Sequence, residues 1–139
     1  MLYYFIVNGR EDKAFIMDDL MPQLKDVSIK YEIYKTIGEG DATRFVHMDC
    51  DFHSQDEVCF VACGGTGTLS EVVNGLVGSP NKSVALLAYG AGNNFTFHFP
   101  GRNFRSVKDL IDGADINLFH LFSCHFFFSF HGASTSSGM

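Results

Sequence analysis

A glycine-rich segment at residues 64–75 contains the residues of this chain that are best suited to chemistry. It follows an apolar run at residues 58–63, which predicts a buried parallel strand. After the glycines, apolar residues recur at helical spacing and predict a helix over residues 69–77. Backbone N–H groups in a glycine turn and the positive end of a helix dipole both favour a phosphate. The segment therefore predicts a nucleotide-phosphate site.

Two common phosphate-binding motifs do not fit this segment. A dinucleotide-binding turn requires Gly-x-Gly-x-x-Gly and an acidic residue at the end of the next strand. Ser70 stands where the third glycine belongs, and the next apolar run ends in Tyr89 and Gly90. A P-loop requires Gly-Lys-Ser/Thr, and the sequence contains no Gly-Lys pair. The pattern therefore argues against a dehydrogenase and against a P-loop enzyme.

Four segments resemble, in the same order, the diacylglycerol kinase catalytic domain that bacterial lipid kinases and sphingosine kinases share. Residues 64–75, GGTGTLSEVVNG, are similar to the family signature GGDGT-x-x-E-V-x-N-G, whose GGDGT part also marks NAD kinases more distantly. Residues 5–9, FIVNG, resemble a first strand that ends in I-V-N-P. Residues 36–43, TIGEGDAT, are similar to T-x-x-x-G-(D/H)-A, and residues 89–95, YGAGNNF, to P-x-G-T-G-N-D-F. The resemblance extends from about residue 2 to residue 117.

This resemblance implies a three-layer, Rossmann-like α/β domain with a mostly parallel sheet over residues 1–117. It also implies ATP binding and transfer of the γ-phosphoryl group, with Mg2+, to the hydroxyl group of a diacylglycerol-like or sphingoid lipid. The nucleotide contacts that it implies are Asn8, Gly9, Thr36, Gly64, Gly65, Thr66, Gly67, Thr68, Leu69, Ser70, Gly90, Ala91, Gly92, Asn93 and Asn94.

Two features depart from the family pattern. Thr66 occupies the position of the family's aspartate, and a neutral hydroxyl is neither a strong base nor a hard magnesium ligand at neutral pH. We therefore assign no catalytic residue and no metal ligand. From residue 118 the sequence LFHLFSCHFFF no longer follows the family. We expect residues 118–139 to be an atypical tail, with the second, β-rich domain of these kinases absent.

Two alternatives stay open at this point. A non-catalytic nucleotide-binding or interaction domain is favoured by Thr66 and by the missing second domain. An NAD-kinase-like enzyme is disfavoured by the complete E-V-x-N-G continuation and by the glycine–asparagine segment at residues 90–94.

Strands and helices are expected to alternate along the chain. Apolar runs predict strands at residues 2–7, 29–35, 58–63 and 84–88, and helical periodicity predicts helices at 13–25, 41–48, 69–77 and 106–111. Pro22 predicts a kink or a late break in the first helix. Glu71 is expected in the first turn of its helix, where a carboxylate complements the dipole. Ligands of parallel sheets bind beyond the carboxyl ends of the strands, so the four segments can converge there.

Length and composition restrict the class of protein. A chain of 139 residues with 46% apolar residues predicts one folded domain. A net charge of −6 argues against a nucleic-acid partner. Of the 4 cysteines, Cys59 and Cys63 lie in the predicted buried strand and Cys50 and Cys124 have no paired spacing, which favours reduced thiols in the cytoplasm. The histidines at residues 47–53 lack zinc-ligand spacing, metal binding by those of the tail is disfavoured, and no metal site is predicted.

The apolar runs are too short to serve as a leader or a membrane anchor. The run at residues 2–7 lacks the features of a signal peptide. Polar residues interrupt residues 118–130, and a bilayer requires about 20 apolar residues. We therefore expect a soluble, cytoplasmic protein without a transmembrane segment that contacts the membrane at most peripherally. The phenylalanine-rich tail would form an exposed apolar patch and favour a homo-oligomer.

Overall fold

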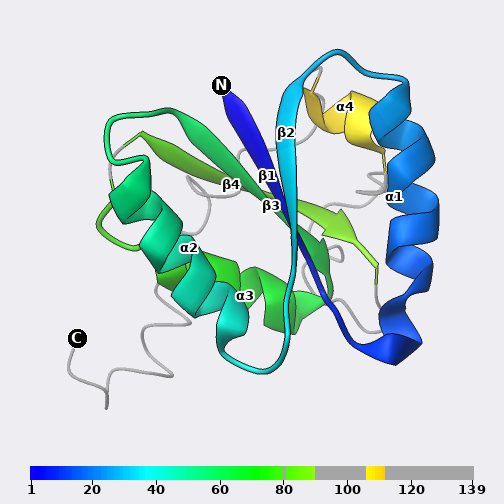
Figure 1. Ribbon diagram of the computed structural model, residues 1–139, viewed down its shortest axis with the longest axis horizontal. Helices are drawn as coiled ribbons and strands as arrows, with labels where there is room; N and C mark the ends of the chain where they lie inside the picture. Colours follow the sequence, from blue (N-terminus) through cyan, green and yellow to red (C-terminus); the bar gives the residue numbers. More distant parts are fainter. Residues whose placement is uncertain (80, 90–105, 112–139) are drawn as a thin grey trace.

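A computed structural model describes residues 1–79, 81–89 and 106–111 of the chain (Figure 1). The expectations for residues 90–94 and 118–139 concern residues outside these ranges. The strands are β1 (Leu2–Val7), β2 (Lys30–Lys35), β3 (Val58–Gly64) and β4 (Lys82–Ala88). The helices are η1 (Glu11–Lys13, a 3-10 turn), α1 (Phe15–Lys25), α2 (Asp41–Phe52), α3 (Thr66–Leu76) and α4 (Val107–Ile111).

The described strands form one parallel sheet in the order β2-β1-β3-β4. Every residue of β3 is buried, as expected for a central strand that helices cover on both faces. At the edge of the sheet, β2 alternates between exposed and half-buried side chains. The predicted α/β class with a parallel sheet is confirmed.

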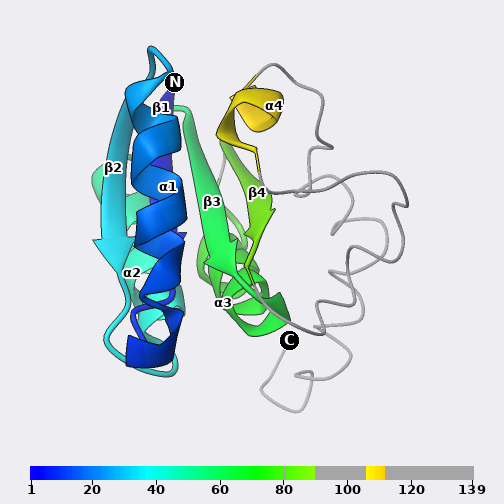
Figure 2. The same cartoon turned by 90° about the vertical axis from the view of Figure 1, so that its right-hand side faces the viewer.

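Two hydrophobic clusters lie on opposite faces of the sheet. On one face, α2 and α3 pack their apolar residues, among them Val46 and Val72, against Ile6 and Phe60. On the other face, α1 and α4 pack against the alternate residues of the same strands, such as Phe5. Figure 1 shows α1 and α4 on one side of the sheet and α2 and α3 on the other, and Figure 2 shows α1 in front of β1 and β2. The arrangement therefore has the three predicted layers.

The observed boundaries differ from the predicted ones mainly at α3 and α2. Helix α3 begins at Thr66, three residues before the predicted start, because the glycines do not prevent Thr66, Gly67 and Thr68 from adopting helical geometry. The prediction that Glu71 lies in the first turn is therefore wrong, and that turn contains no acidic residue. Helix α2 continues four residues beyond the predicted end, to Phe52, because Asp49 and Cys50 are still buried against the sheet side of the helix.

Pro22 lies inside α1 without ending it, so the predicted late break is not observed. Proline removes one backbone hydrogen bond, but Ile16, Leu20 and Leu24 are buried on the sheet and hold the helix in place. In the part of the chain that the structure describes, every helix is too short or too polar to cross a bilayer.

Candidate functional site

A cavity of about 260 Å³ lies beyond the carboxyl ends of β1 and β2, next to the first turns of α2 and α3. This is the edge of the sheet at which ligands of parallel α/β proteins bind. The residues that line it are Asn8, Gly9, Arg10, Thr36, Ile37, Gly38, Glu39, Ala42, Gly67, Thr68 and Glu71.

Three of the four predicted segments meet at this cavity. The predicted contacts that line it are Asn8, Gly9, Thr36, Gly67 and Thr68. Other predicted contacts belong to the same turn and helix without lining the cavity, namely Gly64, Gly65, Thr66, Leu69 and Ser70. The Leu69 side chain is buried in the core beneath α3. The remaining predicted contacts, Gly90, Ala91, Gly92, Asn93 and Asn94, lie outside the described residues.

Gly9 lines the cavity at a point where the chain passes very close to the end of β2. A Cβ atom at Gly9 would lie 2.0 Å from the backbone oxygen of Thr36, so no other residue fits without moving the backbone. The Gly9 N–H donates to the Thr36 hydroxyl oxygen at 3.2 Å, and the Thr36 N–H donates to the Val7 carbonyl at 2.9 Å. The family-like residues at the ends of β1 and β2 therefore hold the two strand ends together.

The first turn of α3 presents backbone N–H groups near the cavity, where Gly67 and Thr68 belong to the lining. Its N-cap residue is Gly65, and no side chain caps the turn. The first N–H groups of a helix have no partners within the helix, and together with the helix dipole they attract anions. The start of α3 is therefore suited to bind a phosphate group.

The glycines of this turn are not explained by backbone conformation. Among the described glycines only Gly40 and Gly78 have positive φ, so a turn that needs left-handed residues does not account for Gly64, Gly65 and Gly67. A Cβ atom at Gly64 would lie 2.6 Å from the Thr68 hydroxyl oxygen, whereas at Gly65 and Gly67 it would meet no atom within 4 Å. A side chain at Gly64 would therefore displace Thr68, while Gly65 and Gly67 leave open space beside the N–H groups.

Asp41 holds the connection between β2 and α2, which forms the opposite wall. Its buried carboxylate accepts hydrogen bonds from the Tyr34 hydroxyl at 2.7 Å and from the Ile37 N–H at 2.9 Å, and it pairs with Arg44. The Tyr34 hydrogen bond, followed by those from Ile37 and Arg44, holds the pKa of Asp41 below its ordinary value although burial opposes this shift. The same hydrogen bond raises the pKa of Tyr34. Asp41 thus fixes the residues that lead into α2.

Glu71 connects α3 to the start of α2. Its carboxylate accepts a hydrogen bond from the Ala42 N–H at 3.2 Å, and its backbone carbonyl accepts one from the Thr43 hydroxyl at 2.8 Å. Glu71 therefore occupies the anion-binding end of α2 and leaves that of α3 without an acidic partner. The sequence contained one signal for this role, because Glu71 belongs to the family-like E-V-x-N-G stretch.

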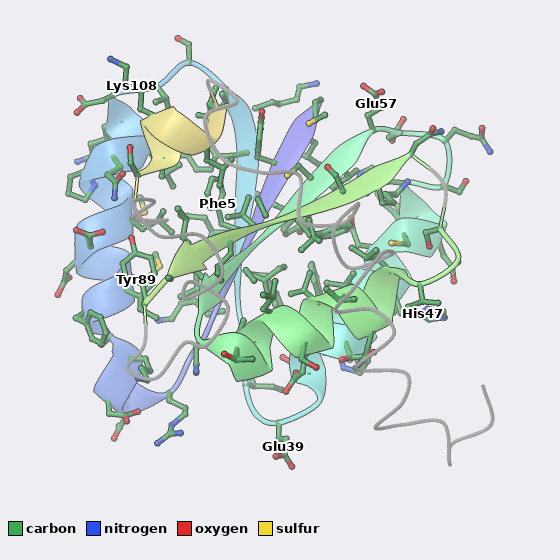
Figure 3. All side chains as sticks on the ribbon, turned by 180° about the vertical axis from the view of Figure 1, so that it is seen from behind. Phe5, Glu39, His47, Glu57, Tyr89 and Lys108 are labelled. Carbon is green, nitrogen blue, oxygen red and sulfur yellow. The ribbon has the colours of Figure 1, made fainter. Side chains whose placement is uncertain are left out.

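The cavity also contains charged residues that the sequence did not identify as site residues. Arg10 is the one basic residue among those that line it, and it is exposed. Glu39 lies on the connection before α2, and Figure 3 shows its side chain pointing away from the sheet. The position of Arg10, directly after the strand-end residues Asn8 and Gly9, is a signal that could have identified it.

The described residues around the cavity offer little to hold a magnesium ion by themselves. No three His, Cys, Asp or Glu side chains gather to hold a metal ion in the described part of the chain. The carboxylates that line the cavity are Glu39 and Glu71, and Glu71 already binds the Ala42 N–H. Thr66, at the position of the family's aspartate, is half-buried and supplies a neutral oxygen. Mg2+ at such a site would have to be bound mainly by nucleotide phosphates, as is common for this ion.

Tyr89 fixes the place where the chain leaves β4. Its N–H donates to the Gly64 carbonyl at 3.0 Å, and its hydroxyl donates to Asp19 on α1 at 2.5 Å. Figure 3 shows Tyr89 beside α1 at the end of β4. Tyr89 therefore links the end of β4 to the end of β3 and to α1.

Comparisons with known proteins agree with this fold. Residues 3–123 match the diacylglycerol kinase catalytic domain. The chain is 30% identical over 118 residues to a diacylglycerol kinase of Staphylococcus haemolyticus, an alignment that covers 80% of this chain and 34% of the relative. It is 28% identical over 115 residues to the diacylglycerol kinase of Staphylococcus saprophyticus, covering 81% of this chain and 37% of the relative.

A solved diacylglycerol kinase of Bacillus anthracis has the same fold, with a TM-score of 0.61 and 26% sequence identity over 80% of this chain and 39% of that one. The chain belongs to the diacylglycerol kinase catalytic domain family, which is a family of lipid kinases. It spans about a third of the length of the curated relatives that it matches.

Proposed function

We propose that the cavity binds the phosphate groups of ATP and that residues 1–117 are the nucleotide-binding domain of a lipid kinase. The observation that carries this proposal is the uncapped first turn of α3, where Gly65 and Gly67 leave open space beside backbone donors. Family membership adds that the relatives are diacylglycerol kinases, whose name implies ATP as the phosphoryl donor. No other described helix start at the cavity is open to an anion, since Glu71 occupies that of α2.

The reaction that we propose is transfer of the γ-phosphoryl group of ATP to the hydroxyl of a diacylglycerol-like or sphingoid lipid, in the cytoplasm at a membrane surface. Phosphoryl transfer depends mainly on positioning and on neutralising the charge of the transferred group. In this chain, the N–H groups of α3 and Arg10 would bind and orient the phosphates, and Asp41 and Glu71 would hold the walls around them. Magnesium bound to the nucleotide would supply further charge neutralisation.

A second candidate function is nucleotide binding without catalysis. Thr66 favours it, because the family's carboxylate is replaced by a hydroxyl that cannot act as a strong base. The two candidates share the nucleotide site and differ only in turnover. Incubation with radiolabelled ATP, Mg2+ and diacylglycerol in mixed micelles separates them, since labelled lipid supports the kinase and bound ATP without labelled lipid supports the second candidate.

Nucleotide binding itself is tested by thermal stabilisation in the presence of ATP. A ligand at ten times its Kd stabilises the folded state by about 1.4 kcal/mol, which raises Tm by about 5 °C for a chain of this size. Gly65→Leu should abolish this shift while preserving the fold, because Gly65 has an extended backbone and a Cβ there meets no atom.

The matched control is Asn74→Leu, which introduces the same side chain at an exposed position near the carboxyl end of α3, away from the first turn beside the cavity. This variant should retain the ATP-induced shift. An equal shift in the Gly65 variant and the unmodified chain would contradict the proposed site.

A further inference from the structure

The guanidinium of Arg10, which lines the cavity, is already paired with a carboxylate of the chain itself. Arg10 and Asp12 form a two-pronged ion pair, in which Nε donates to Oδ1 at 3.1 Å and Nη2 donates to Oδ2 at 3.2 Å. Asp12 is not among the residues that line the cavity, so the pair directs the guanidinium toward a group outside it. The other charged residues at the cavity, Glu39 and Glu71, are acidic and would repel a polyphosphate.

The backbone around this pair is fixed, so the two side chains stay within reach of each other. The Arg10 N–H donates to the Asn8 side-chain oxygen at 3.1 Å. The Arg10 carbonyl accepts a hydrogen bond from the Lys13 N–H at 2.9 Å, which closes the turn η1 that contains Asp12. Gly9, directly before Arg10, is tightly packed against the end of β2. The turn therefore keeps Arg10 at the cavity edge and Asp12 beside it.

The pair is weak enough to be exchanged for a ligand. The side chains of Arg10 and Asp12 are 70% and 60% exposed, and exposed ion pairs contribute little because water and salt screen them. A guanidinium binds a phosphate with the same two-pronged geometry as a carboxylate, and a polyphosphate has more charge than one carboxylate. A phosphate in the cavity can therefore displace Asp12, but it must compete with it.

We propose that Asp12 is a built-in competitor for Arg10 that lowers and tunes the affinity of the cavity for nucleotide polyphosphates. This inference rests on the proposed function. It adds Asp12 as a residue that sets the affinity of the cavity for phosphates. Arg10 leaves Asp12 when the phosphates bind and returns to Asp12 when they leave. The effect is specific to the phosphates, so adenosine is insensitive to both residues.

The test measures the affinity of the full 139-residue chain for ATP, tripolyphosphate and adenosine by titration calorimetry at about 0.15 M salt, where unpaired exposed charges are screened. The proteins are the unmodified chain, Asp12→Asn, Arg10→Gln, the double variant and Glu11→Gln. Glu11 is the matched control, because it lies in the same exposed turn and its replacement makes the same change in net charge, whereas no ion pair joins it to Arg10 among the described residues.

Asp12→Asn should tighten binding of ATP and tripolyphosphate by about two- to fivefold, the effect of removing an exposed ion pair. Glu11→Gln should change it by less than about 1.5-fold, since screening weakens the influence of an unpaired exposed charge. Arg10→Gln should weaken binding by about tenfold, and in that background Asp12→Asn should have no further effect.

The inference would be overturned if Asp12→Asn and Glu11→Gln tighten phosphate binding equally, or if Asp12→Asn still tightens it in the Arg10→Gln background. Either result would leave the nucleotide site intact. A chain that binds neither ATP nor tripolyphosphate in any of the five forms would instead refute the proposed function, and the competition with it. Binding by Asp12→Asn alone would support both.

Discussion

Replacing Gly67 with alanine should make the protein more stable and a poorer nucleotide binder. Gly67 lies in the first turn of α3, has no positive φ, and a Cβ there would meet no atom within 4 Å. Nothing in the fold then opposes the methyl group, and alanine is favoured over glycine in a helix by about 0.5–1 kcal/mol. For a chain of this length, that gain corresponds to a rise in Tm of about 2–4 °C.

The loss of binding follows from the same open space. A hydrogen bond from a backbone N–H to a charged oxygen contributes about 1.5–3 kcal/mol, so a methyl group that blocks one phosphate oxygen should weaken ATP binding by about ten- to a hundredfold. Thermal unfolding without ligand measures the first effect, and titration calorimetry with ATP measures the second.

Gly75→Ala is the control variant, whose stability should change in the opposite direction. A Cβ at Gly75 would lie 2.7 Å from the Thr43 carbonyl oxygen and 2.8 Å from the Val46 Cβ, where α2 and α3 pack together. This variant should lose about 1–3 kcal/mol of stability by overpacking. A Gly67→Ala protein that binds ATP like the unmodified chain would refute the reasoning that this glycine is kept to make room for a ligand.

Three further predictions concern Thr66, Asp41 and Cys59. Magnesium should strengthen ATP binding only slightly in the unmodified chain, and Thr66→Asp should introduce a clear magnesium dependence. Titrating ATP with and without Mg2+ measures both. A strong magnesium dependence in the unmodified chain would show that Thr66 does not impair magnesium binding. The hydrogen bond from Tyr34 lowers the pKa of Asp41 below its ordinary 3.8, so its stabilising effect is complete above about pH 4 and is lost as the pH falls through the folded-state value. Asp41→Asn should therefore be less stable than the unmodified chain at pH 7, with a difference in denaturant midpoint that narrows toward pH 2; a constant difference would contradict this. Burial raises the pKa of Cys59 to about 11, so iodoacetamide at pH 8 should label this thiol only after unfolding, as peptide mass mapping can show.

The sequence predicted most of the sheet because apolar runs and the order of motifs are local signals. The run at residues 2–7 became β1 with the predicted limits, and β3 and β4 differ from prediction by one and two residues at one end. The start of α3 was placed too late, because glycines are poor helix formers and Gly67 was assigned to the turn. Tertiary packing overrides that local preference.

The walls of the cavity could be predicted only in part. Asn8, Thr36 and Gly67 were recognised because they belong to family-like segments at strand ends. The contact between Glu71 and the Ala42 N–H joins residues 29 apart, and no periodicity or local motif encodes such a pairing. Arg10 was missed for a different reason, since an exposed arginine in a turn is common and its value depends on the cavity beside it.

The central claim is that a nucleotide binds with its phosphates between the ends of β1 and β2 and the first turn of α3. The most direct measurement is the change in backbone amide NMR shifts of the 15N-labelled chain on addition of ATP. The account predicts the largest changes at the cavity residues Gly9, Gly38, Gly67 and Thr68, with adenosine alone changing them less. Changes confined to α1, where a second hollow lies beside Met17 and Met21, or no changes at saturating ATP, would contradict it.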